Sequence, residues 1–157
     1  MSKDRRYWDA NAFLGWFLGE PDKVSSCETV IRACERGECE IVTSAVTLTE
    51  VIKLKGEPPL KEADEQKIKD FFENDYILIA ELTRFIGEKA RHLIWKHQTL
   101  KPKDAIHLAT AIDVDSPYLD TFDNGLLKLN GKLDGVLIHI GKPSLPMQAD
   151  LELRRNE

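Results

Sequence analysis

Short β-prone segments alternate with helical segments along almost the whole chain, and this alternation constrains the fold more than any other feature of the sequence. Runs of β-branched, aromatic or other large apolar residues predict five strands, at Arg6–Trp8, Glu40–Thr43, Tyr76–Ile79, Tyr118–Thr121 and Val136–Ile140. Strands separated by helices are joined by βαβ crossovers, which produce a mostly parallel sheet covered by helices on both faces. The sequence therefore predicts an α/β fold.

The segments between the strands carry helical patterns. A helix at Ala12–Leu18 should stop at Gly19, and the next, capped by Asp22, should end near Gly37. Ser44 is expected to cap the helix after the second strand. The remaining predicted helices are Ala45–Lys55, Lys61–Asn74, Thr83–His97, a helix led by Pro102, and Asn124–Leu129.

The helix led by Pro102 has the clearest pattern. Ala105, Leu108, Ala109 and Ile112 recur at helical spacing and form one apolar stripe. Asp104 falls in the first turn, where unpaired N–H groups and the positive end of the helix dipole favour a carboxylate. Asp104 could therefore serve only as a first-turn charge, or it could belong to a functional site.

Length and composition suit a single domain over residues 1–157, with an extended tail at 142–157. No run approaches the ~18 apolar residues of a membrane helix, so no membrane association is expected. The three cysteines lack metal-ligand spacing and are expected to be reduced core residues of a cytoplasmic protein. A net charge of −5 argues against a protein that coats nucleic acid, but not against a nuclease with an acidic metal pocket.

Four carboxylates occupy chain positions that converge. Asp9 closes the first strand, Glu50 lies in the helix after the second, Asp104 opens a helix, and Asp123 follows the fourth strand. In a parallel α/β sheet the carboxyl ends of the strands form one rim, where ligands bind. Each acid also has a simpler role: Asp9 and Asp123 could cap helices and Glu50 could be solvated. Asp120 lies on the opposite face of its strand from Thr121 and is expected to be structural.

Carboxylates gathered at one rim would repel each other unless divalent cations neutralised them. Mg²⁺ and Mn²⁺ are the matching hard cations, and a carboxylate-bound metal suits phosphodiester hydrolysis. His107, one turn after Asp104, could face this pocket or pack in the core. Four lysines near these acids could contact phosphates, although they could equally be ordinary surface residues: Lys53, Lys55, Lys101 and Lys103.

Four stretches resemble the motifs of the PIN-domain nucleases, and especially the compact VapC-type toxins. YWDANAFLGWF resembles the opening strand with its Asp, TSAVTLTEV the Thr/Ser-rich stretch before the helix Glu, KPKDAIHLATA the third motif, and YLDTFDNGLL the last. The resemblance covers about residues 5–141. It implies an α/β/α sandwich with strand order 3-2-1-4-5.

The resemblance also implies a function. Asp9, Glu50, Asp104 and Asp123 would be the catalytic ligands of Mg²⁺ or Mn²⁺, supported by Asn11 and Thr121, and the substrate would be single-stranded RNA. The chain would be an endoribonuclease and plausibly the toxin of a type II toxin–antitoxin pair. The alternatives are a PIN-type RNA-processing or DNA nuclease without antitoxin, a HAD-like phosphatase with Asp9 as nucleophile, and a non-catalytic binding module.

The predicted partners are RNA, an antitoxin and a second copy of the chain. An antitoxin arginine could enter the acidic cleft and pair with Asp104 or Glu50. The helix Ala12–Leu18 carries more large apolar residues than one buried face needs. Its aromatic residues, among them Trp16 and Phe17, could fill the core, form a homodimer interface or contact an antitoxin helix.

Overall fold

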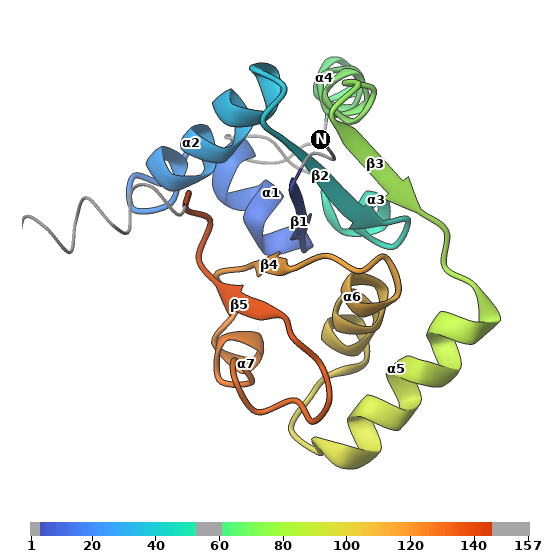
Figure 1. Ribbon diagram of the computed structural model, residues 1–157. Coiled ribbons are helices and arrows are strands. Elements are labelled where there is room, and N and C mark those ends of the chain that lie inside the picture. The colour runs from blue at the N-terminus through green and yellow to red at the C-terminus, as the bar shows by residue number, and fades with distance from the viewer. Residues whose placement is uncertain (1–3, 53–60, 146–157) are drawn as a thin grey trace, which may run out of the picture.

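A computed structural model describes residues 4–52 and 61–145 of the chain (Figure 1). Lys53 and Lys55, with the end of the predicted helix Ala45–Lys55, lie outside the described residues. Most of the predicted tail, from residue 146 onward, also lies outside them. The predictions made for these segments therefore stay predictions.

The described strands form one parallel sheet in the order β3-β2-β1-β4-β5. This order confirms the architecture that the motifs implied. The strands are β1 Asp4–Trp8, β2 Cys39–Ser44, β3 Ile77–Ala80, β4 Tyr118–Asp120 and β5 His139–Gly141. The reversal of chain order between β1 and β4 places the carboxyl ends of β1 and β4 side by side, since Trp8 is in register with Asp120.

Helices cover both faces of this sheet. They are α1 Ala10–Phe17, α2 Val24–Glu35, α3 Thr47–Glu50, α4 Glu62–Phe72, α5 Arg84–Lys96, α6 Pro102–Asp113 and α7 Asn124–Leu127. Side chains of β1 alternate between the two layers: Tyr7 packs with α5, α6 and α7, and Trp8 packs with α1, α2 and α4. Figure 1 shows α1 and α2 on one side of the sheet, and α5 and α6 on the other. The molecule is thus an α/β/α sandwich with two apolar cores.

Several local predictions are confirmed. Thr83 caps α5, because its hydroxyl accepts from the Ile86 N–H at 3.2 Å. Gly37, just beyond α2, has φ +79°, a conformation that favours glycine. The three cysteines are free and buried. A separate finding concerns membrane spans: among the described residues, no helix is long and apolar enough to cross a membrane.

Three local predictions are wrong. The helix predicted from Ala45 is only the turn α3, because Val46, Thr47, Thr49, Val51 and Ile52 are β-branched and lose side-chain freedom in a helix. Asp22 does not cap α2; Lys23 holds the cap position without a side-chain hydrogen bond. Strand β5 begins at His139 rather than Val136, because pairing with β4 starts at His139.

A buried ion pair joins β1 to β4 on the α1/α2 side of the sheet. The Arg6 guanidinium donates to both oxygens of Asp120, at 2.7 and 2.8 Å, and the Trp8 indole N–H donates to Asp120 at 2.9 Å. Arg6 and Asp120 are almost fully buried. Asp120 therefore points away from Thr121, into a site where its charge is matched, as the strand alternation predicted.

Candidate active site at the carboxyl edge of the sheet

The four predicted carboxylates lie on elements that end or begin at the carboxyl edge of the sheet. Asp9 directly follows β1, Glu50 is the last residue of α3, Asp104 is in the first turn of α6, and Asp123 precedes α7. The charges of the other acids meet at Asp104. Burial raises the pKa of Asp104, and the carboxylates of Asp123 and Glu50 raise it further. Asp104 in turn raises the pKa of Asp9.

Asp9 is the most deeply buried of the four, at 2% exposure. One carboxylate oxygen accepts from the Ala12 N–H at 3.0 Å and thereby caps α1, and the other accepts from the Thr121 hydroxyl. Burial raises the pKa of Asp9 to about 6, although the Thr121 hydroxyl, the His107 ring and the Ala12 N–H favour its charged form. None of the ion pairs within residues 4–52 and 61–145 involves Asp9.

Thr121 connects two of the acids. Its hydroxyl donates to Asp9 and accepts from the backbone N–H of Asp123 at 2.9 Å. Asp123 in turn caps α7, because its carboxylate accepts from the Leu126 N–H at 3.0 Å. Asp9 and Asp123 thus do act as helix caps, the simpler role considered from sequence. A capping carboxylate retains free lone pairs, so this role leaves room for metal binding as well.

Glu50 is held by His107. The His107 Nε2 lies 2.9 Å from Glu50 Oε1, and its Nδ1 lies 2.7 Å from the Tyr7 hydroxyl. Burial raises the pKa of Tyr7 well above its ordinary value, so Tyr7 keeps its proton. Because a carboxylate only accepts, His107 donates from Nε2 to Glu50, and its ring bridges the Tyr7 hydroxyl and the Glu50 carboxylate. His107 therefore both packs in the core, at 2% exposure, and faces the site.

Sequence reasoning left the role of His107 open and missed Tyr7 altogether. The spacing of β1 held a usable signal for Tyr7. Side chains two residues apart in a strand share a face, so Tyr7 lies below Asp9 on the face that α6 covers. A polar hydroxyl there needs a partner inside the sandwich, and His107 on α6 is that partner.

The residues predicted to support the site or to contact RNA differ in how close they lie to the four acids. Lys103 is exposed, and its ammonium lies 4.0 Å from Glu50 Oε2. Lys101 lowers the pKa of Asp104 through its charge. Asn11 is exposed in the first turn of α1, whereas Thr121 is fully buried against Asp9. The structure thus brings Thr121, Lys101 and Lys103 toward the acids.

The four acids form the donor set that a divalent metal would meet at this edge of the sheet. Within residues 4–52 and 61–145, no group of three or more His, Cys, Asp or Glu side chains is arranged to hold an ion as it stands. The chemistry of the donors nevertheless matches a hard cation, since all four offer carboxylate oxygens. Mutual repulsion raises the pKa of Asp104, and a divalent cation would relieve that repulsion. The residues therefore fit Mg²⁺ or Mn²⁺ chemically.

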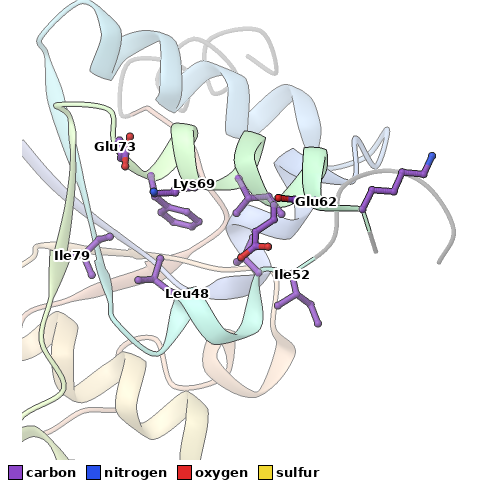
Figure 2. Close-up of a pocket in the computed structure, with 11 residues that line it drawn as sticks. Leu48, Ile52, Glu62, Lys69, Glu73 and Ile79 are labelled. Atoms are coloured by element: carbon purple, nitrogen blue, oxygen red, sulfur yellow. The ribbon is translucent and has the colours of Figure 1, made fainter. Parts of the chain in front are cut away.

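One hollow of the molecule lies away from the four acids. A pocket of about 680 Å³ opens between α3, α4 and β3, and Figure 2 shows Leu48, Ile52 and Ile79 around it. Charged residues, among them Glu62, Lys69 and Glu73, form part of its lining. None of the four acids lines this pocket, so its size carries no weight in locating the chemistry. The acids identify the candidate active site.

A comparison with protein families decides the assignment. The PIN-domain profile matches residues 6–132 of this chain. The chain belongs to the PIN-domain family. This confirms the family that the motifs resembled, and it supports a hydrolase that acts on nucleic acid.

The fold of this PIN domain is similar to that of a solved toxin structure. That structure is VapC20 of Mycobacterium tuberculosis, described as a sarcin–ricin-loop-cleaving toxin. The two chains share 13% sequence identity at a TM-score of 0.61, and the alignment covers 76% of this chain and 90% of VapC20. At this identity the likeness establishes the fold alone. No curated protein matches the chain.

Proposed function

We propose that this PIN-domain protein is an endoribonuclease that depends on Mg²⁺ or Mn²⁺ and cleaves single-stranded RNA. The observation that carries the proposal is the placement of Asp9, Glu50, Asp104 and Asp123 at the carboxyl edge of the sheet, on elements that end or begin there. These carboxylates would hold the metal, which supplies an activated water and stabilises charge on the scissile phosphate when it is bound. RNA follows from the toxin-like fold.

The side chains around these acids have distinct roles in the proposal. His107 orients Glu50 and is itself fixed by the Tyr7 hydroxyl, so the Glu50 carboxylate is preorganised. Thr121 fixes Asp9 relative to Asp123. Lys101 and Lys103 place positive charge at the mouth of the site, where a phosphate backbone would approach.

The test is cleavage of a single-stranded RNA with Mn²⁺ and with EDTA. Asp104→Asn removes one charge and keeps the shape, and it should lower the cleavage rate by about 10²–10³-fold or more. The matched control is Asp113→Asn, an exposed aspartate at the other end of α6, which should cleave like the unaltered protein. Cleavage that resists both EDTA and Asp104→Asn would refute the proposal.

Parallel substrates separate the alternatives. A DNA strand of the same sequence tests for a DNA nuclease, and release of phosphate from a small phosphoester tests for a phosphatase. We expect Asp104-dependent activity on RNA only. RNA binding without any metal-dependent cleavage would instead favour a non-catalytic module.

We further propose that the protein is a toxin silenced by an antitoxin. Support comes from the toxin-like fold and from Trp16 and Phe17, which remain partly exposed beside the α1/α2/α4 core. These rings could contact an antitoxin helix or a second copy of the chain. Expression should arrest growth, Asp104→Asn should abolish the arrest, and the product of a neighbouring gene should relieve it. Growth unaffected by expression of the active nuclease would contradict this part.

A further inference from the structure

The segment from Lys89 to Lys103 has an unusual charge for this protein. It contains five lysine or arginine residues and two histidines but no aspartate or glutamate, whereas the whole chain carries a net charge of −5. The cations are Lys89, Arg91, Lys96, Lys101 and Lys103. The segment covers the second half of α5 and the start of α6, and it ends next to Asp104.

Trp95 lies within this segment and is 78% exposed. It points to the side of α5 opposite the buried stripe formed by Ile86, Ala90 and Leu93. Arg91 and His92 lie one helical turn before it, and both are exposed. An exposed tryptophan among cations offers a flat aromatic surface next to positive charge, which are the two features that an unpaired base and its phosphate contact.

A hollow lies beside this face of α5. It has a volume of about 390 Å³ and separates α5 from the loop that precedes β5. Four cationic or titratable side chains of α5 and its C-cap line it, with Asp134 as the acid opposite: Lys89, His92, Lys96 and His97. Apolar side chains complete the lining: Leu93, Ile112, Leu133 and Val136. The lysines and histidines along α5 offer N–H donors and positive charge to phosphate groups.

Positively charged side chains also lie between the hollow and the four acids of the candidate active site. Lys96 lies on the hollow, Lys101 acts on the pKa of Asp104, and Lys103 lies 4.0 Å from Glu50. A polyanion seated along α5 would therefore meet positive charge from the hollow to the candidate active site. Figure 1 shows α5 and α6 as adjacent helices on the same side of the sheet.

We propose that α5 binds single-stranded RNA, with Trp95 as a base-stacking platform and the surrounding cations as phosphate contacts. This rests on the proposed ribonuclease function and names the surface that delivers its substrate. Aromatic rings interleaved with cations are the arrangement that recognises unpaired bases and their backbone. A second copy of the chain would bring the same cations against this face, so charge favours RNA over self-association.

The test measures RNA binding without cleavage. Fluorescence anisotropy of a labelled single-stranded RNA is recorded in EDTA, where metal-dependent cleavage does not occur. Trp95→Ala should raise Kd roughly 5- to 100-fold, and Trp95→Phe should restore most of the affinity. Lys96→Ala should reduce the salt dependence of binding by about one released counterion. An RNA duplex should bind more weakly, because its bases are already stacked.

Leu82→Ala is the matched control. Leu82 is also an exposed large apolar residue, at 46% exposure, but it precedes both α5 and the basic segment. The control should bind RNA like the unaltered protein. Equal binding by Trp95→Ala and the unaltered protein would overturn the proposal, as would equal losses in Trp95→Ala and Leu82→Ala. A change of oligomeric state in Trp95→Ala, seen by sedimentation with RNA affinity unchanged, would assign the face to self-association.

The design separates this inference from the proposed function. Binding in EDTA that depends on Trp95 would support the face even if Asp104→Asn left cleavage unchanged. Conversely, cleavage that depends on Asp104, together with RNA binding that is unchanged in Trp95→Ala, would support the nuclease proposal and refute only the RNA-binding role of α5.

Discussion

Two buried aspartates at neighbouring strand ends show how environment divides one residue type into two roles. Asp9 follows β1 and Asp120 ends β4, and each is at most 2% exposed. Asp120 faces α1 and α2 and is paired with Arg6 and Trp8. Asp9 faces α6 and is held by a hydroxyl and a backbone N–H, with the Asp104 carboxylate nearby. Burial alone therefore does not identify a metal ligand; the charge of the partners does.

The largest difference between the two aspartates should appear on substitution. Asp120→Ala leaves Arg6 buried without its counterion and should destabilise the fold by about 3–5 kcal/mol. Asp9→Asn removes a charge that has no cationic partner among the described ion pairs, so stability at pH 7.5 in EDTA should stay equal or rise. Urea denaturation measures both. Sequence alone indicated a structural role for Asp120, and its buried ion pair with Arg6 agrees with that role.

A double substitution sharpens the same contrast. Arg6→Met with Asp120→Leu removes both charges and should recover much of the stability lost in Asp120→Ala. Equal destabilisation by Asp9→Asn and Asp120→Ala would show that Asp9 is as structural as Asp120, and would break the comparison.

The second largest difference between Asp9 and Asp120 should appear in the pH dependence of stability. The pKa of Asp9 is raised from 3.8 to about 6, so the folded protein binds its proton more tightly than the unfolded chain does. Stability from this group is fully present below pH 4 and is lost as the pH rises through about 6. About two pKa units correspond to roughly 3 kcal/mol. Denaturation in EDTA between pH 4 and 8 should show this loss, and Asp9→Asn should lack it; an unchanged slope in Asp9→Asn would contradict the assignment.

Metal should have the smallest effect on stability. Mn²⁺ at ten times its Kd should stabilise the fold by about 1.4 kcal/mol, because it binds the folded carboxylates and relieves their repulsion. Thermal melts with Mn²⁺ and with EDTA measure this shift. Asp104→Asn should reduce it, whereas Asp113→Asn should keep it. A melting temperature that is the same with and without millimolar Mn²⁺ would count against the metal site.

Sequence patterns predicted the layers, the strands and most helices, because each element is specified locally by periodicity, caps and turn residues. They also placed Asp9, Glu50, Asp104 and Asp123 at one edge, since parallel strands carry their ends to the same side. The family motifs supplied the strand order. Residue patterns alone do not specify that order, because it depends on which strands pair at long range.

Other features depend on tertiary packing and could not be predicted from the sequence. The contact between His107 and Glu50 joins residues of α6 and α3, and no local pattern indicates it. The apolar pattern after β2 predicted a long helix, but the β-branched residues in this segment disfavour a helix. The helix α3 therefore ends at Glu50, earlier than the pattern indicated. Arg6 gave no signal as a buried residue, because a lone arginine in a strand is usually exposed.

The Thr121 hydroxyl bond to Asp9 has a consequence for biosynthesis. It joins residues 112 positions apart, and the Glu50 contact to His107 spans 57 positions. Contacts of such length form late in folding, since the intervening chain must close first. A nascent chain on the ribosome that has not yet released β4 cannot assemble these carboxylates. The four carboxylates thus lie together only after β4 and Asp123 have emerged, so the acidic edge is among the last features of the molecule to form.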